Sequence, residues 1–261
     1  MSVSKKKIRA DELVLSMGHA ETRSKAQALI LAGLVFYKTP QDKDWKKILK
    51  AGEFLLPEIE IDTSRLGPKD VGRGAQKLRE ALKVWPQINV KNALCLDVGS
   101  STGGFTQVLL ENGATKVVAL DVGTGQLHEK LKNDPRVISV EQQHVLRVEP
   151  ELWTKIGTEP SFAVIVTDLS FISLTKIIPT VSQWLQPGGY WVLLIKPQFE
   201  LEPKKVPKGI VRNDEYRAEA IQKVRVVLNN TKGLEWIGIA DSPILGGDGN
   251  KEYLACVKST S

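Results

Sequence analysis

The sequence has little of what marks several large classes of protein. It contains only two cysteines, Cys95 and Cys256, and both lie in apolar runs, which predicts buried thiols in a reducing compartment and excludes a disulfide scaffold. Its three histidines are scattered, so we expect no metal site. No apolar run is long enough to span a bilayer, and the basic N-terminus lacks the apolar core of a signal peptide. We therefore expect a cytoplasmic protein.

Positive charge is what the sequence has in excess. Lys and Arg number 36 against 30 Asp and Glu, which gives a net charge of +6 and a pI near 9.2. Such a balance favours a polyanionic partner. The length of 261 residues and the hydrophobic content of 42% suit one large domain and one small one.

The segment at residues 94–105 carries the most information. It reads as a buried strand that ends in Asp97, then a glycine-rich turn, then the start of a helix. A second strand, at 116–121, ends in Asp121. This order is typical of the opening βαβ unit of a nucleotide-type binding fold.

The spacing of the turn indicates which ligand it serves. Its pattern is Gly-x-x-x-Gly-Gly, which is neither a dinucleotide fingerprint nor a P-loop. The Asp97 carboxylate would repel a pyrophosphate but suits a cationic amine, so S-adenosylmethionine is the expected ligand. Asp121 is placed to accept hydrogen bonds from the two ribose hydroxyls. The alternative is a glycine turn that only lets a helix pack on a strand.

The rest of the chain predicts an α/β fold of the Rossmann-like methyltransferase type. Strands are expected at 93–97, 116–121, 137–140, 162–167, 190–196, 235–240 and 253–258, and helices at 104–112, 125–131, 173–185 and 214–229. Alternating strands and helices imply a parallel sheet with helices on both faces and ligands at the carboxyl ends of its strands.

The N-terminal residues differ in pattern, with expected helices at 8–17 and 24–32 and short strands at 34–37 and 59–61. The motifs Arg9-x-Asp11, Thr-Arg-Ser-Lys-Ala at 22–26 and Ile-Leu-Ala-Gly-Leu-Val at 30–35 resemble the S4-like RNA-binding domain, a small α+β module. The resemblance covers residues 7–62, departs from the usual Asn-Gly turn at 36–39, and implies RNA contacts by Arg9, Arg23 and Lys25. The alternative is a small capping domain with a solvated charged face.

A connector is expected between the two parts. The Gly-Pro pair at 67–68 breaks regular structure, and a helix follows at 73–84. Arg65, Lys69 and Arg73 could extend a track for RNA, although a solvated linker explains them as well. We therefore divide the chain into an RNA-binding domain at 1–62, a connector at 63–90 and a methyltransferase domain at 91–261.

Four charged residues stand where packing gives no reason for them. Asp168 and Lys196 each end an apolar strand, Glu252 directly precedes the last strand, and Lys77 lies in the connector helix. Burying an unpaired lysine is costly, so Lys196 needs an explanation. A structural Lys196–Asp168 ion pair with a surface Lys77 and a catalytic set are equally open on spacing alone.

The order of motifs favours catalysis. Arg-Gly-Ala-Gln-Lys-Leu at 73–78, the glycine turn, Asp-Leu-Ser-Phe at 168–171, Lys-Pro-Gln-Phe-Glu at 196–200 and Gly-Asn-x-Glu at 249–252 resemble the TlyA family, a branch of the FtsJ-like ribosomal RNA 2'-O-methyltransferases. The resemblance implies a catalytic set of Lys77, Asp168, Lys196 and Glu252. It also implies a cytidine target at the ribosomal subunit interface, in 16S RNA, 23S RNA or both.

The residue types support this chemistry. A neutral Lys196 can take the proton of a ribose hydroxyl while Asp168 orients it, and Glu252 would hold Lys77 or a ribose hydroxyl. The expected cofactor-binding residues are Asp97, Gly99, Ser101, Gly103, Phe105, Asp121, Val145 and Asp168.

Other functions fit less well. Base N-methylation uses an Asn/Asp-Pro-Pro-aromatic motif, which is absent at 168–171, and carbon methylation of cytosine needs a positioned cysteine nucleophile. A non-catalytic RNA-binding or ribosome-assembly factor stays open. A membrane-active haemolysin, a name that members of this family have carried, lacks support because no strongly amphipathic basic helix is present.

Overall fold

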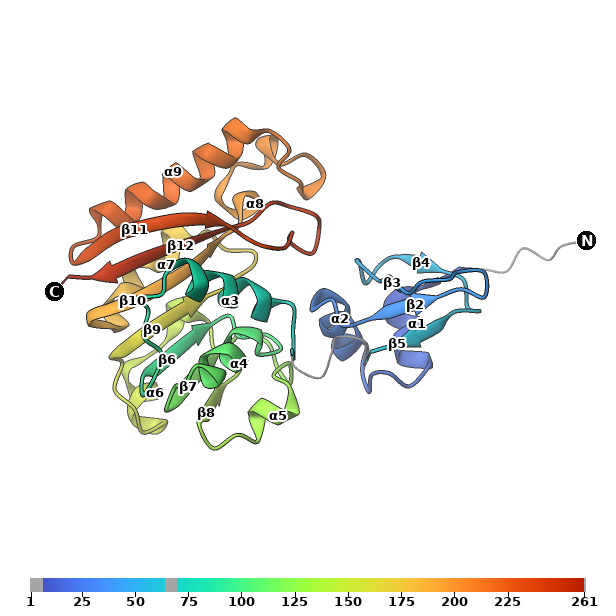
Figure 1. Ribbon diagram of the computed structural model, residues 1–261, viewed down its shortest axis with the longest axis horizontal. Helices are drawn as coiled ribbons and strands as arrows, with labels where there is room; N and C mark the ends of the chain where they lie inside the picture. The colour runs from blue at the N-terminus through green and yellow to red at the C-terminus, as the bar shows by residue number, and fades with distance from the viewer. Residues whose placement is uncertain (1–6, 64–69, 261) are drawn as a thin grey trace, which may run out of the picture. The chain divides into compact units, whose positions relative to one another are not determined.

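The computed structural model describes residues 7–63 and 70–260 (Figure 1). The chain divides between Arg73 and Gly74 into two compact units, which we describe separately. Arg65 and Lys69 lie outside the described residues.

The first unit is a small α+β fold with its own core. Its helices are α1 (Ala10–Ser16) and α2 (Arg23–Leu31), and its strands are β1 (Ile8–Arg9), β2 (Phe36–Lys38), β3 (Lys46–Lys47), β4 (Phe54–Leu55) and β5 (Glu60–Asp62). The strands form one three-stranded sheet, β3-β2-β5, and the pair β1-β4. Leu13, Ile30 and Ile48 are buried between these elements, so the unit has an apolar centre independent of the second unit.

Two details of this unit differ from the sequence prediction. Ile8 and Arg9 are extended because they pair with Leu55 and Phe54, and the helix begins only at Ala10. The charged stretch at 41–50 contains β3, which is exposed. Pairing with a distant strand overrides local propensity in both cases.

The second unit is built on a seven-stranded sheet in the order β11-β12-β10-β9-β6-β7-β8. All neighbours from β10 to β8 are parallel, whereas β12 runs antiparallel to both β10 and β11. The expected all-parallel sheet is therefore wrong for β12. The strands are β6 (Leu94–Val98), β7 (Lys116–Leu120), β8 (Val137–Val140), β9 (Phe162–Thr167), β10 (Leu185–Ile195), β11 (Leu234–Asp241) and β12 (Tyr253–Ser259).

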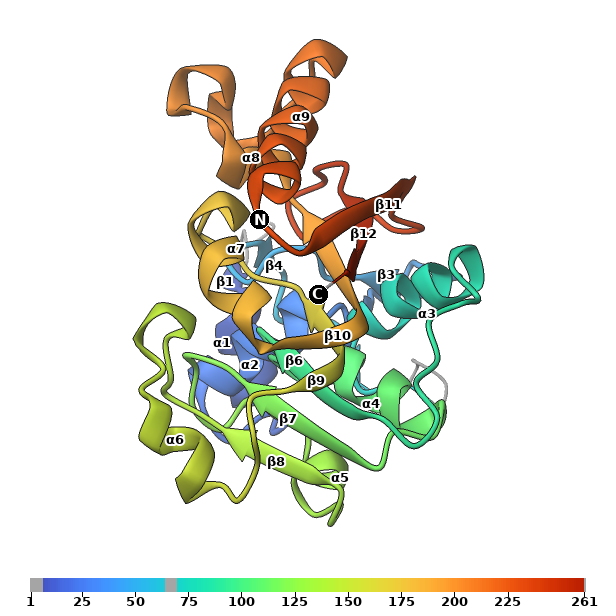
Figure 2. The ribbon, with the colours of Figure 1, turned by 90° about the vertical axis from the view of Figure 1, so that its left-hand side faces the viewer.

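Helices cover both faces of this sheet. In Figure 2, α3 and α4 lie on one face, and α6 and α7 lie on the other. The helices are α3 (Gly74–Val84), α4 (Gly104–Glu111), α5 (Glu129–Lys132), α6 (Pro150–Lys155), α7 (Leu174–Val181), α8 (Pro197–Glu200) and α9 (Asp214–Asn230). Short 3-10 turns add η1 (Val145–Arg147), η2 (Ser182–Trp184), η3 (Pro203–Lys205) and η4 (Pro207–Gly209).

The expected seven strands and the α/β class are confirmed, with differences in the helices. The helix expected at 125–131 is only α5, and the one expected at 173–185 ends at Val181 and continues as η2. Helix α6 was not expected from the sequence; it begins at Pro150, and proline is tolerated in the first helical turn.

The strand order indicates which edge of the sheet binds ligands. Strand β6 lies between β9 and β7, so the chain leaves it in opposite directions for its two neighbours. In open α/β sheets, ligands bind outside the carboxyl ends of the strands at such a switch point. Asp97, Asp168 and Lys196 all lie at or next to these ends.

Candidate active site

The glycine-rich turn brings two strand ends into close contact. Gly99 has φ +86°, and a Cβ there would lie 2.6 Å from the carbonyl oxygen of Asp168. Gly103, with φ +93°, caps α4, and a Cβ there would lie 2.2 Å from Leu131. Only glycine fits either position, so the turn can lie directly against the end of β9.

Asp97 is a completely buried acid with an unused oxygen. Its Oδ2 accepts hydrogen bonds from the Thr106 N–H at 2.9 Å and from the Thr106 hydroxyl at 2.7 Å. Its Oδ1 is buried and has no hydrogen-bond partner among the described residues. Burial raises the pKa of Asp97 to about 7, against the lowering effect of Thr106. The ammonium of S-adenosylmethionine would satisfy this oxygen, so the residues present fit that cofactor.

Asp121 follows β7 and closes the other side of the turn. Its Oδ2 accepts from the Ser101 N–H at 2.8 Å, and its Oδ1 accepts from the Gly123 N–H at 2.7 Å. Each carboxylate oxygen can accept more than one hydrogen bond, so Asp121 can still receive ribose hydroxyls.

The remaining cofactor candidates are buried parts of the same region. Val145 begins η1, whose N-cap His144 accepts a hydrogen bond from Leu146 N–H at 3.1 Å. Phe105 lies in the first turn of α4 with its ring beside Gly74. Phe105 therefore packs from α4 against the start of α3.

Four charged residues form a continuous chain next to the turn. Lys196 Nζ lies 2.7 Å from Asp168 Oδ1, and Lys77 Nζ lies 3.3 Å from Asp168 Oδ2. Lys77 Nζ also lies 2.8 Å from Glu252 Oε2. The structure therefore brings together all four residues that the sequence singled out: Lys77 in α3, Asp168 directly after β9, Lys196 directly after β10 and Glu252 directly before β12.

This cluster is electrically balanced and largely buried. Burial alone would raise the pKa of Asp168, but the ammonium groups of Lys196 and Lys77 outweigh it and hold that pKa well below its usual range. Lys77 is only 4% exposed, so the alternative of a surface Lys77 is wrong. Asp168 thus stays ionised and fixes both lysines.

Hydrogen bonds hold the ends of β9 and β10 together. Lys196 Nζ donates to Ser170 Oγ at 2.9 Å. Buried Glu200 accepts from the Ser173 hydroxyl at 2.5 Å and from the Leu174 N–H at 2.8 Å. The loop after β9 and helix α8 after β10 are thereby tied to each other, which fixes Lys196 relative to Asp168.

The turn before β12 is anchored by Asn250, whose role was not recognised from the sequence. Its side chain accepts from Val211 N–H at 2.9 Å and donates to Gly209 O at 2.8 Å. A Cβ at Gly246 would lie 2.5 Å from Glu252 Oε1, so a glycine there leaves room for the carboxylate. These contacts hold Glu252 toward Lys77.

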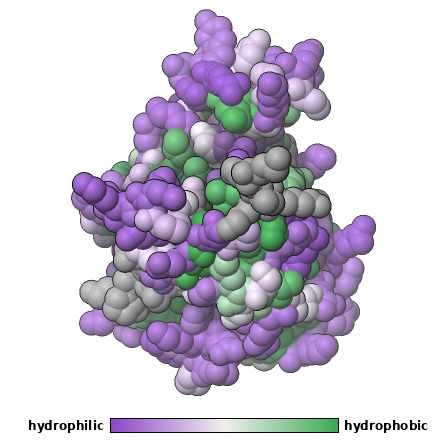
Figure 3. Space-filling view, turned by 90° about the vertical axis from the view of Figure 1, so that its right-hand side faces the viewer, coloured by the Kyte–Doolittle hydropathy of each residue, from purple (hydrophilic) through white to green (hydrophobic). Residues whose placement is uncertain are grey.

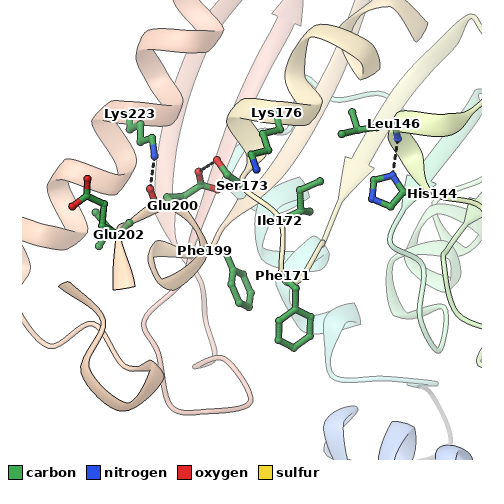
Figure 4. Close-up of a pocket in the computed structure, with 11 residues that line it drawn as sticks. His144, Leu146, Phe171, Ile172, Ser173, Lys176, Phe199, Glu200, Glu202 and Lys223 are labelled. Atoms are coloured by element: carbon green, nitrogen blue, oxygen red, sulfur yellow. Dashed lines mark hydrogen bonds between the residues drawn. The ribbon is translucent and has the colours of Figure 1, made fainter. Parts of the chain in front are cut away.

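Phe171 is the second residue that the sequence prediction missed. Its side chain is 92% exposed and its φ is +66°, a conformation that non-glycine residues rarely adopt. Its ring centroid lies 5.3 Å from that of Phe199, and Figure 4 shows both rings pointing the same way. The sequence signal was an aromatic residue directly after Asp-Leu-Ser, but nothing in it indicated the exposure.

In the first unit, two of the RNA-binding candidates converge on one acid. Asp11 is fully buried and accepts two hydrogen bonds from Arg9, at 3.0 Å each, and one from Arg23 at 3.0 Å. Both arginines stay partly exposed. Lys25 is not part of this group: its Nζ lies 3.8 Å from Oε2 of exposed Glu21. The backbone N–H of Arg73 donates to the carbonyl oxygen of Ala32 at 3.1 Å.

The described residues lack the groups that carbon methylation by a thiolate, a metal site or a membrane-spanning helix would need. Both thiols, Cys95 and Cys256, are buried, which raises the pKa of each to about 12, so neither offers a thiolate for carbon methylation. Within residues 7–63 and 70–260, no group of three or more His, Cys, Asp and Glu could hold a metal ion. None of the helices in the same ranges is both long and apolar enough to cross a membrane.

Comparison with known proteins agrees with this geometry. A family model described as FtsJ-like methyltransferase matches residues 71–259. Hemolysin A of Brachyspira hyodysenteriae is 42% identical, over 95% of this chain and 98% of that protein. The 16S/23S rRNA (cytidine-2'-O)-methyltransferase TlyA of Mycobacterium tuberculosis is 36% identical, over 97% of this chain and 91% of that protein. A solved structure of a hemolysin-named protein from Streptococcus thermophilus is 36% identical with a TM-score of 0.71, over 99% of this chain and 90% of that one. The chain therefore belongs to the FtsJ-like methyltransferases and, among them, to the TlyA family.

Proposed function

We propose that this protein transfers a methyl group from S-adenosylmethionine to the 2'-hydroxyl of a cytidine in ribosomal RNA, at the ribosomal subunit interface. The observation that carries the proposal is the buried chain Lys196–Asp168–Lys77–Glu252 beside the glycine-rich turn. The name of the M. tuberculosis relative, with its 16S/23S rRNA and cytidine-2'-O specificity, supports the substrate.

When bound, S-adenosylmethionine supplies an electrophilic methyl group on a sulfonium. Asp97 Oδ1 would receive the ammonium of its methionine part, and Asp121 its ribose hydroxyls. Gly99, Ser101, Gly103 and Phe105 would shape the turn around it, and Val145 would flank the adenine. The surrounding groups all come from the carboxyl edge of the sheet.

Lys196 would act as the general base. Once the Lys196 ammonium has released a proton, its neutral Nζ would take the proton of the ribose 2'-hydroxyl, which would make that oxygen nucleophilic toward the methyl group that S-adenosylmethionine supplies, with S-adenosylhomocysteine as the leaving group. Asp168 and Ser170 hold that nitrogen in place, and Lys77, itself held by Glu252, fixes the second oxygen of Asp168. Fixed positions of this kind supply much of the acceleration in a transfer between two substrates.

Phe171 would hold the base of the target nucleotide. It directly follows Ser170, whose hydroxyl accepts a hydrogen bond from Lys196 Nζ, and its ring is exposed. A base stacked on an aromatic ring gains about 1–3 kcal/mol. An exposed ring held in an unfavourable backbone conformation is explained by such a role.

The first unit would bind the ribosomal RNA as an S4-like domain over residues 1–62. Arg9 and Arg23, oriented by Asp11, present guanidinium groups that suit phosphate oxygens, and Lys25 and Arg73 add charge. Figure 3 shows hydrophilic residues around most of the visible surface and hydrophobic residues toward its middle. Arg65, in the proposed connector at 63–90, lies outside the described residues and keeps its role only as a sequence prediction.

A ribosomal substrate would place the enzyme in the cytoplasm. The hemolysin names of two relatives suggest membrane activity instead. No particular feature of the described residues favours that activity over methyl transfer.

The test is transfer of labelled methyl from S-adenosylmethionine to unmethylated 30S and 50S subunits. We expect label that protects one ribose from alkaline cleavage, and its loss with Lys196→Ala. Lys155→Ala, an exposed lysine of α6, is the matched control and should transfer normally. RNA binding without label on either subunit would support the non-catalytic binding factor, and label on a base would overturn the 2'-O assignment.

A further inference from the structure

A pocket of about 530 Å³ is lined in part by Phe171, and the proposed reaction leaves most of its other lining residues without a role. The loop after β9, helix α8 and the first turn of α7 form most of its wall (Figure 4). Its volume is in the range of pockets that hold small ligands. The lining side chains that matter for its chemistry are Leu146, Phe171, Ile172, Lys176, Phe199 and Lys223.

Positive charge in this pocket is available to a ligand. Lys176 is exposed, and its ammonium makes no hydrogen bond or ion pair with any described residue. Lys223 donates to the backbone carbonyl of Glu200 at 2.6 Å, so its hydrogen bond is not to a carboxylate. Figure 4 shows both lysines on the same side of the pocket, opposite the two phenylalanine rings.

The acids of the pocket are already engaged. The Glu200 carboxylate accepts from Ser173 and Leu174 and is buried, which raises its pKa. Glu202 Oε2 lies 2.7 Å from Lys204 Nζ. Both carboxylates thus have partners within the protein, and Lys223 also attracts both of them, which leaves Lys176 as the more available ammonium group.

The opposite wall is apolar and aromatic. The ring centroids of Phe171 and Phe199 lie 5.3 Å apart, and Leu146 and Ile172 add further apolar side chains to the lining. A flat aromatic ligand that also carries negative charge matches both walls, and a nucleotide has this combination.

The position of the pocket indicates which nucleotide. Phe171 lines it and directly follows Ser170, whose hydroxyl binds the Nζ of Lys196. We infer that this pocket holds the nucleotide next to the methylated one in the RNA substrate, with its base against Phe199 and its phosphate near Lys176 and Lys223. This inference depends on the proposed function, because it takes the methylated ribose to lie at Lys196.

The same pocket touches the expected adenine region, since His144 and Leu146 flank Val145. An adenine subsite would make the lysines important for cofactor binding. A subsite for RNA would make them important for RNA binding alone. Separate measurements of the two affinities therefore distinguish the two occupants.

The experiment compares Lys176→Ala with Lys155→Ala, which removes another exposed lysine that does not line the pocket. Equilibrium binding of the full-length protein to unmethylated RNA from the subunit that accepts the methyl group is measured at several salt concentrations. Binding of S-adenosylhomocysteine is measured by calorimetry. For Lys176→Ala we expect a three- to tenfold loss of RNA affinity and a salt slope smaller by about 1. The affinity for S-adenosylhomocysteine should not change.

Two outcomes would overturn the inference. The first is an RNA affinity and salt slope that are the same in both variants, whether equal to wild type or equally reduced, and the second is a loss of S-adenosylhomocysteine affinity in Lys176→Ala. A Phe199→Leu variant tests the aromatic wall separately and should weaken RNA binding without changing the salt slope. If the wild type binds RNA but transfers no methyl, the proposed function fails, while the comparison of binding still decides whether the pocket contacts RNA.

Discussion

Lys77 Nζ lies 2.8 Å from Glu252 Oε2, and both side chains are almost completely buried. This pair connects α3 to the start of β12 and presents the same ammonium to Asp168. Removing one partner of a buried ion pair leaves an uncompensated charge, which is more harmful than removing both.

We therefore expect Glu252→Gln to destabilise the second unit by about 3 kcal/mol and to reduce methyl transfer. The double variant Lys77→Met with Glu252→Gln should recover part of the stability but none of the activity, since Asp168 then lacks its second lysine. Chemical denaturation and single-turnover methylation measure the two effects. Recovery of activity in the double variant would contradict the catalytic role of this pair.

Lys196→Arg should separate charge from proton transfer. Arginine keeps a positive charge beside Asp168, but it does not lose its proton in proteins, so it cannot act as a base. We expect a folded protein with normal affinity for S-adenosylhomocysteine and a methyl-transfer rate lowered by about 10²–10⁴-fold. An arginine variant with more than a tenth of the wild-type rate would exclude Lys196 as the base.

Because the pKa of Asp97 is raised, we expect pH to have opposite effects on the stability of the protein and on cofactor binding. Its pKa of about 7 in the folded, ligand-free protein is higher than the ordinary value of 3.8, so the folded state binds the proton more tightly. The stabilisation from this group is fully present below about pH 4 and is lost as pH rises through 7; the total is on the order of 4 kcal/mol.

A cationic amine prefers the ionised form of Asp97. Affinity for S-adenosylhomocysteine should therefore rise up to about tenfold per pH unit below 7 and level off above it. Asp97→Asn should weaken binding and abolish this dependence, while the ligand-free variant should be more stable than wild type at pH 8. Calorimetric titrations between pH 5.5 and 8.5 test this, and a flat wild-type profile would contradict it.

Gly99→Ala and Gly125→Ala form a matched pair. Both glycines have positive φ, but a Cβ at Gly99 would lie 2.6 Å from the Asp168 carbonyl oxygen, whereas nothing lies within 4 Å of one at Gly125. Gly125→Ala should lose only about 1–2 kcal/mol of stability from backbone strain. Gly99→Ala should lose more and also transfer methyl more slowly, because the end of β9 must move. Equal effects on activity would show that the contact with Asp168 is unimportant.

The sequence predicted the parts of the fold and site that are local. Asp97 and Lys196 could be placed because each ends a continuous apolar run, which is typical of buried strands with functional residues at their ends. The antiparallel direction of β12 could not be predicted, because strand direction depends on connections and pairing rather than on composition.

Features that depend on tertiary contacts were missed. The burial of Lys77 requires α3 to pack beside the sheet, and its residue type alone suggests a surface position. The side-chain contacts of Asn250 with Gly209 and Val211 join segments far apart in the chain. Likewise, the helix expected at 125–131 is shorter because residues 121–128 form a loop, in which the Gly123 N–H donates to the Asp121 carboxylate.

Phe171 should show a separation of stability from activity. Its φ of +66° is unfavourable by about 1–3 kcal/mol for a side chain of this kind, and its ring is 92% exposed, so it contributes little to folding. We expect Phe171→Gly to be within about 1 kcal/mol of wild-type stability, because relief of strain offsets the greater freedom of glycine when unfolded. Methyl transfer should nevertheless fall about ten- to hundredfold, the amount that loss of one base–aromatic stack predicts.

Phe171→Trp keeps an aromatic face and should retain most of the activity, whereas Phe171→Leu keeps only apolar bulk and should not. Thermal unfolding and methylation under subsaturating RNA measure the two properties, and a glycine variant as active as wild type would exclude stacking on Phe171 as a step in substrate binding.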